Sequence, residues 1–118
     1  MNFPEAIVRV TEILKELGFG IITEIDVKTT LKNKIDVDFR PYTILGACNP
    51  KVAHAALEKD DKVGILLPCN VVVQQKMDGE VEVFIINPEI AVKALHNPEL
   101  EDFACEVTGM MKKVIARL

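Results

Sequence analysis

The sequence between residues 42 and 73 opens with Tyr42-Thr43-Ile44-Leu45-Gly46-Ala47-Cys48-Asn49-Pro50 and closes with Leu66-Leu67-Pro68-Cys69-Asn70-Val71-Val72-Val73. Each of these two runs contains a Cys-Asn pair next to an apolar segment that is typical of a β-strand. Residues 43–48 are apolar on both faces of an extended chain, which predicts a central strand covered above and below. The two Cys-Asn pairs therefore lie at strand ends, and the other segments form a scaffold around them.

Asn-Pro dipeptides predict three helix starts in this chain. Asparagine accepts a backbone hydrogen bond as N-cap, and proline fits the first helical position because its φ is already set and no needed donor is lost. The dipeptide occurs at residues 49–50, 87–88 and 97–98. We predict helices over residues 50–59, 88–95 and 98–117. The first of them is expected to pack Val52, Ala53, Ala56 and Leu57 inward.

The N-terminal part predicts a helix, a strand and a second helix. Apolar residues on one stripe indicate a helix over residues 3–17, with Gly18 as its stop. Alternation then predicts a half-buried strand over residues 19–27, with Phe19, Ile21, Thr23, Ile25 and Val27 on one side. Asp26 can cap a helix over residues 27–34, in which Leu31 is expected to point inward, and residues 36–41 form a loop.

The middle of the chain predicts three further strands. We expect them over residues 63–67, 70–76 and 81–86. Pro68 separates the first strand from the second, and Asp78-Gly79 forms the hairpin turn between the second and the third. The order of elements and the ready hairpin favour an α+β fold over a doubly wound parallel sheet. With 118 residues, the chain is expected to form a single domain over residues 1–118.

Composition excludes several classes of function. The net charge of −4 argues against nucleic-acid binding, which needs clustered lysines and arginines. The sequence contains no serine, which excludes a serine nucleophile. No apolar run is long enough to span a membrane and the N-terminus has no secretory signal, so we expect a soluble, cytoplasmic protein. Its three cysteines are expected to be reduced thiols.

Cys48 is the first candidate for chemistry, because it precedes the N-cap of a predicted helix. Free amides and the helix dipole favour a thiolate there, which would suit a nucleophile. A buried apolar role is the commoner outcome for a free cysteine on a central strand. His54, one turn further on, could complete a Cys-His pair, but it falls off the inward stripe and is expected to face solvent.

Cys69 is the second candidate, since it lies at a break in a strand. If its strand neighbours that of Cys48, the two sulfurs could form a redox pair or bind a soft metal. The spacing of the remaining candidates, His54, His96 and Cys105, does not match a zinc site, so we expect no metal. Cys105 is expected to be structural, and His96 to lie at a helix C-terminus.

The asparagines of the two pairs also have two interpretations. Asn49 and Asn70 could satisfy local backbone groups, as asparagine commonly does beside turns and caps. Together with Lys51 and the free amides of the helix start, they could instead hold an anion, although no glycine-rich cradle accompanies them.

Several strings in order resemble a known family. They are Gly18-Phe19-Gly20, Thr23-Glu24-Ile25-Asp26-Val27, Val37-Asp38-Phe39-Arg40-Pro41-Tyr42, Ile44-Leu45-Gly46-Ala47-Cys48-Asn49-Pro50, Ala56-Leu57 and Leu66-Leu67-Pro68-Cys69-Asn70-Val71. With these strings, the chain resembles the uncharacterised family called domain of unknown function 302. The resemblance implies an α+β fold with helices packed on a curved, mainly antiparallel sheet, and a homodimer. It implies no established reaction or cofactor.

Three functions therefore remain open, and with them whether the protein is an enzyme. The first is a dimeric module that binds a small molecule or a partner at Cys48, Asn49, Cys69 and Asn70. The second is a redox or nucleophilic thiol protein that uses Cys48 and Cys69. The third is a structural dimer without a site.

Overall fold

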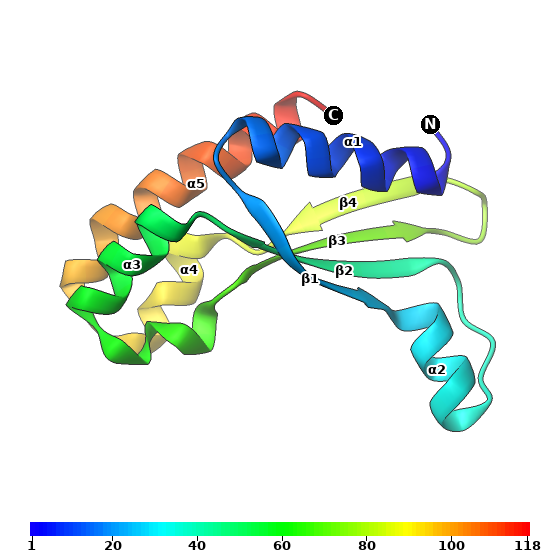
Figure 1. Cartoon of the computed structure of the whole chain (residues 1–118), viewed down its shortest axis with the longest axis horizontal. Coiled ribbons are helices and arrows are strands. Elements are labelled where there is room, and N and C mark those ends of the chain that lie inside the picture. Colours follow the sequence, from blue (N-terminus) through cyan, green and yellow to red (C-terminus); the bar gives the residue numbers. More distant parts are fainter.

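The fold is a four-stranded antiparallel sheet with helices packed against it. A computed structural model describes residues 1–118 (Figure 1). The strands are β1 (Gly20–Asp26), β2 (Tyr42–Cys48), β3 (Cys69–Gln75) and β4 (Val81–Ile85), in the sheet order β1-β2-β3-β4. All three strand pairs are antiparallel. The predicted α+β class is confirmed.

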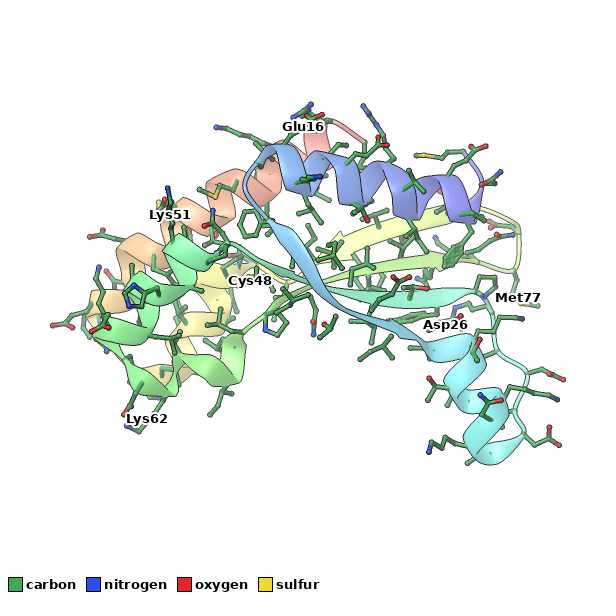
Figure 2. All side chains as sticks on the ribbon, in the orientation of Figure 1. Glu16, Asp26, Cys48, Lys51, Lys62 and Met77 are labelled. Carbon is green, nitrogen blue, oxygen red and sulfur yellow. The ribbon has the colours of Figure 1, made fainter.

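Two long helices cover one face of this sheet. They are α1 (Phe3–Glu16) and α5 (Glu101–Ala116), which lie on the same side of the sheet in Figure 1. Both follow the predicted apolar stripes, which the sheet buries. Glu16 at the end of α1, labelled in Figure 2, pairs with Arg117 just beyond α5. The C-terminal ends of the two helices are thereby joined on this face.

The hydrophobic core lies between these helices and alternate residues of the strands. Leu45 and Ala47 of β2 and Val71 and Val73 of β3 are fully buried. Because side chains alternate along a strand, the residues between them point to the other face of the sheet. Nineteen buried apolar residues form this cluster, which is the hydrophobic core of the chain.

Strand β1 lies at one edge of the sheet. Six of its seven residues are exposed, so it is not the half-buried strand predicted. The pairing with β2 shifts between Ile21 and Thr23, where a bulge adds one residue. Ile21 therefore packs against the core, while Thr23 and Ile25 lie on the opposite face. The prediction that all three share a face was wrong, since the sequence gives no sign of the bulge.

The face of the sheet opposite α1 and α5, which we call the open face, has no helix packed along it. The register places Ile25, Ile44, Val72 and Phe84 directly opposite one another across the four strands on this face. Ile44 and Val72 are only partly buried. The prediction that residues 43–48 are covered on both faces was therefore wrong for the single chain.

Helix α2 (Val27–Ile35) begins at Asp26 as predicted, because the Asp26 side chain accepts a hydrogen bond from the Thr29 amide at 3.0 Å. None of its residues is fully buried, but Leu31 is partly buried whereas residues 28–30 and 32–35 are exposed, which agrees with the inward position predicted for it. The helix leaves the end of β1 and projects from the sheet on the side opposite α1 (Figure 1). It contributes little to the core.

Helix α3 (Pro50–Lys59) has the predicted bounds. Ala56 is buried and Val52 packs against the core, but Leu57 is exposed, contrary to prediction. The helix is short and contacts the core only along a narrow stripe. Leu57 falls just outside that stripe.

The segment predicted as a strand over residues 63–67 is a 3₁₀ helix, η1 (Asp61–Leu66). Asp60 caps it by accepting a hydrogen bond from the Lys62 amide at 2.9 Å. Val63 is buried and Leu66 is partly buried, whereas Ile65 is 80% exposed. This spacing of three matches a 3₁₀ helix, and a five-residue apolar run cannot distinguish the two structures by itself.

In the C-terminal third, helical segments begin at both Asn-Pro dipeptides, as predicted. It contains α4 (Pro88–Val92), η2 (Lys93–Leu95) and η3 (Pro98–Leu100) before α5. The side chains of Asn49, Asn87 and Asn97 accept hydrogen bonds from backbone amides at 3.3, 2.9 and 3.0 Å. All three predicted caps are confirmed, and so is the hairpin turn, where Gly79 has a φ of +87°.

Gly46 on the open face allows two other residues to approach β2 closely. A Cβ at this position would overlap the Thr23 hydroxyl and lie 2.8 Å from Cγ of Pro68. We expect Gly46→Ala to lower the free energy of unfolding by about 1–3 kcal/mol, the usual range for overpacking. Urea unfolding followed by circular dichroism measures this change.

Gly109→Ala is the matched control, because Gly109 lies in α5 and a Cβ there would meet nothing within 4 Å. We expect this variant to be about 0.5–1 kcal/mol more stable than the wild type, since alanine favours the helix. A Gly46→Ala protein as stable as the wild type would contradict the close packing at β2.

Candidate functional site

Cys48 and Cys69 lie on neighbouring strands. Cys69 begins β3 and pairs with Ala47 of β2, so Cys48 is the next residue along the partner strand. Both cysteines are partly buried, and both are free thiols. They line the same small cavity where β2 passes into α3, near the Cys48 label in Figure 2. The structure thus places side by side the two thiols that the sequence singled out.

The cavity between the thiols is too small for a ligand. Its volume is about 10 Å³, which is the space of roughly one water molecule. Nine of its ten lining residues are hydrophobic, so a water there would find few polar partners. The lining residues are Phe19, Ala47, Cys48, Asn49, Val52, Ala53, Leu67, Cys69, Phe103 and Val107.

Burial raises the pKa of the Cys69 thiol, and the neighbouring Cys48 raises it further. Water stabilises a thiolate better than this apolar corner does, so the neutral thiol is favoured. A nucleophilic cysteine requires the opposite shift. The Cys69 environment is therefore that of a protonated thiol at neutral pH.

Asn49 has a structural role, because its side chain caps α3 through the Val52 amide. It also lines the small cavity beside Cys48. Lys51 is exposed on α3, and Figure 2 places it at the outer surface of the molecule. No arrangement of Asn49, Asn70 and Lys51 around a common anion is present, since Asn70 lies on the open face opposite Gly46.

A larger groove lies on the other side of Cys69. Its volume is about 240 Å³, and eight of its eleven lining residues are hydrophobic. Cys69 and Asn70 form one wall, while η1 and the segment leading into α4 form the others. We call this the Cys69 groove; its lining residues are Ile65, Leu66, Leu67, Pro68, Cys69, Asn70, Ile86, Pro88, Ala91, Val92 and Phe103.

The four predicted site residues are therefore divided between two hollows. Cys48 and Asn49 face the small cavity, Asn70 faces the groove, and Cys69 borders both. The sequence did not identify the remaining walls of the groove. They come from residues 65–68 and 86–92 and from Phe103 of α5, and residues 65–67 were predicted as part of a strand. The available signal was Ile65 and Ile86, apolar residues that precede a proline by three and two positions.

The remaining candidates lie elsewhere. His54 is exposed on α3 and its Nε2 lies 3.1 Å from a carboxylate oxygen of Glu58, so it faces solvent as predicted. His96 ends η2 with a φ of +52°, at the predicted helix C-terminus. Cys105 is exposed on α5, so the prediction of a structural role was wrong. No group of three His, Cys, Asp or Glu side chains is placed to hold a metal ion.

Comparison with known proteins places the chain in a family. The family model described as "Domain of unknown function DUF302" matches residues 1–118. The chain belongs to the DUF302 family. The predicted resemblance is thus confirmed.

A crystal structure of a DUF302 protein matches this DUF302 domain closely. It is described as that of an uncharacterized conserved protein from Bacillus stearothermophilus. The two share 31% sequence identity and a TM-score of 0.92, over 99% of this chain and 91% of the other. No match was found among curated proteins. No helix of the DUF302 domain has both the length and the apolar character needed to cross a bilayer.

The burial of the thiols predicts their order of alkylation. We expect iodoacetamide at neutral pH to modify Cys105 first and Cys69 last, because Cys105 is exposed and the pKa of Cys69 is raised. Peptide mass spectrometry of quenched samples measures the three rates, which should converge in urea. Equal rates for Cys69 and Cys105 in the folded protein would contradict the protected thiol.

The raised pKa of Cys69 also predicts a loss of stability at alkaline pH. The folded state keeps a proton that the unfolded state releases, so the stabilisation is complete below the unfolded pKa and is lost as pH rises through the folded pKa. We expect the unfolding free energy to fall less steeply with pH in Cys69→Ala than in the wild type. Urea titrations across the alkaline range measure the two slopes.

Cys105→Ala is the control for this comparison, since it removes an exposed thiol. It should follow the wild-type slope. A Cys69→Ala protein with the wild-type slope would show that burial does not perturb the thiol.

Proposed function

We propose that this DUF302 domain is a binding module for a small, mainly apolar molecule, which it holds in the Cys69 groove. The observation that carries the proposal is the groove itself, a hollow of about 240 Å³ with eight hydrophobic residues among the eleven that line it. Ligand sites are typically concave and mostly apolar, with a few polar groups that fix orientation. The groove has this character and lies beside one of the two Cys-Asn pairs.

The dimensions of the groove limit the ligand. Pockets for drug-sized molecules are about 300–1,000 Å³, so the Cys69 groove suits a smaller molecule. Burying its apolar body would contribute about 25 cal/mol for each Å² removed from water. The Asn70 amide, exposed at the rim, offers one donor group and one acceptor to a polar end of the ligand.

The chemistry of Cys69 supports a wall of the binding site rather than a nucleophile. Its pKa is raised by burial, which leaves little thiolate at neutral pH. The nearest expected base, His54, is exposed and already pairs with Glu58. A thiol mechanism would need a base or a cation that lowers the pKa, and neither is among the residues that line the groove.

The binding proposal is tested with a variant that fills the groove. Ala91 lines the groove from α4, so Ala91→Leu should occupy part of its volume. With 8-anilinonaphthalene-1-sulfonate as the fluorescent probe, we expect at least about a tenfold weaker affinity in Ala91→Leu than in the wild type, which is a loss of about 1.4 kcal/mol. Native mass spectrometry of freshly purified protein should show a retained mass that the variant lacks.

Ala55→Leu is the matched control, because Ala55 is exposed on α3 and does not line the groove. It should bind the probe as the wild type does. Probe binding that Ala91→Leu leaves unchanged, together with no retained mass, would overturn the proposal. That result would favour the structural protein without a site.

A further inference from the structure

Strand β4 forms one edge of the sheet, and its outer side is unpaired. At the hairpin, the Lys76 amide donates to the carbonyl oxygen of Glu80 at 2.8 Å. Bonded positions recur every second residue along an antiparallel strand, so residues 82 and 84 also bond β3. The amides and carbonyls of Val81, Val83 and Ile85 therefore point away from the sheet. No hydrogen bond outside the β3–β4 ladder involves these three residues.

Strand β4 lacks the features by which edge strands usually avoid pairing. A bulge, a proline or a lysine commonly protects such an edge. The pairing of β4 with β3 runs from residue 81 to residue 85 without a bulge, and residues 81–86 include neither proline nor lysine. At the other edge of the sheet, the bulge after Ile21 interrupts the pairing of β1. Strand β4 is therefore the edge that is suited to accept a further strand.

An apolar groove lies beside this edge, on the side of the sheet that α1 and α5 cover. Its volume is about 550 Å³, and six of its eight lining residues are hydrophobic. Val81 and Val83 line it from β4, while Met1, Ile115 and Leu118 line it from the two terminal segments. The last three side chains are 66%, 46% and 38% exposed. We call this hollow the edge groove.

A strand added to β4 would place every second side chain over the edge groove. Residues paired across neighbouring strands point to the same face, so those opposite Val81, Val83 and Ile85 would share their face of the sheet. Val81 and Val83 themselves line the groove on that face. The free donors and acceptors repeat about every 6.8 Å along the edge, a spacing that another extended chain matches and a compact small molecule does not.

The hairpin end of this edge carries an excess of negative charge. Asp78, Glu80 and Glu82 lie near a single cation, Lys76, whose Nζ is 3.1 Å from Glu82 and 3.8 Å from Glu80. The hydrogen bond to Glu82 raises the pKa of Lys76, and the charges of Glu82, Glu80 and Asp78 raise it further. One cation does not neutralise three carboxylates, so this end favours a basic residue from a partner.

We propose that β4 binds an extended segment of another protein as a fifth, antiparallel strand, with alternate apolar side chains in the edge groove and a basic residue at the hairpin. The antiparallel direction continues that of the other strand pairs and places the C-terminal end of the bound segment beside Glu80. Main-chain hydrogen bonds supply the affinity in this mode of recognition, and the pockets for alternate side chains supply the specificity.

The test uses a fluorescein-labelled probe peptide of sequence Val-Thr-Val-Thr-Val-Lys-Lys and the full chain, followed by fluorescence anisotropy. In the proposed register the valines lie opposite Ile85, Val83 and Val81, and the first lysine lies opposite Glu80. We expect saturable binding, with an affinity at least about tenfold lower for a peptide N-methylated at the central valine, because that amide faces β4. N-methylation of the second threonine is the matched control, since its amide faces away and binding should be unchanged.

Val83→Pro removes an outward amide from the protein itself. Proline is tolerated at an edge position whose N–H faces solvent, and circular dichroism checks that the variant is folded. We expect it to bind the probe peptide at least about tenfold more weakly than the wild type. Glu24→Pro is the control, because it places a proline on the other edge strand, away from the edge groove, and it should bind as the wild type does.

The charge of the bound segment is tested with a second peptide, in which two glutamates replace the two lysines. We expect it to bind at least about tenfold more weakly than the parent peptide at low salt, because its charges repel Glu80 and Asp78. Equal binding of the two peptides would overturn the basic end of the partner.

The absence of saturable binding, or equal binding of the peptide N-methylated at the central valine, would overturn the added strand. A wild-type dimer in sedimentation velocity that Val83→Pro dissociates would also overturn it, since a second copy of the chain would then occupy the edge. The result is independent of the Cys69 groove, which shares no lining residue with the edge groove. Ala91→Leu should therefore bind the probe peptide as the wild type does.

Discussion

The burial of one face of β2 and β3 beneath α1 and α5 determines the rest of the structure. Leu45, Val71 and Val73 are fully buried there. A slip of one residue would turn this whole set to the other face, so the core holds the strands in a single register. That register sets Ala47 opposite Cys69, and it brings the two Cys-Asn pairs together as a result of packing.

One-sided burial also separates the molecule into a closed part and an accessible part. Beneath the helices, the hollow beside the thiols has a volume of only about 10 Å³. Other apolar side chains lie outside that core: Ile25 and Phe84 on the open face and Ile65 at the Cys69 groove are exposed in the single chain. Apolar residues that a core does not require are the ones for which binding is the natural explanation.

Local signals in the sequence were sufficient for most of the secondary structure. Each Asn-Pro start is confirmed, because a cap depends only on hydrogen bonds within three residues. The bulge after Ile21 and the 3₁₀ helix η1 were missed, since both depend on packing between distant segments. For the same reason the sequence selected the cysteines but could not show that their strands pair, nor that η1 and α4 enclose a groove.

The meander order of the sheet affects how the chain folds during synthesis. Every strand pairs only with its neighbours in sequence, so no pairing has to close a loop that spans most of the chain. The contact between Glu16 and Arg117 spans nearly the whole chain, so α5 completes the core only after its last residues have been made. Until then α1 alone covers its face of the sheet, and the apolar side chains that α5 buries remain exposed, a condition that makes a nascent chain prone to aggregation.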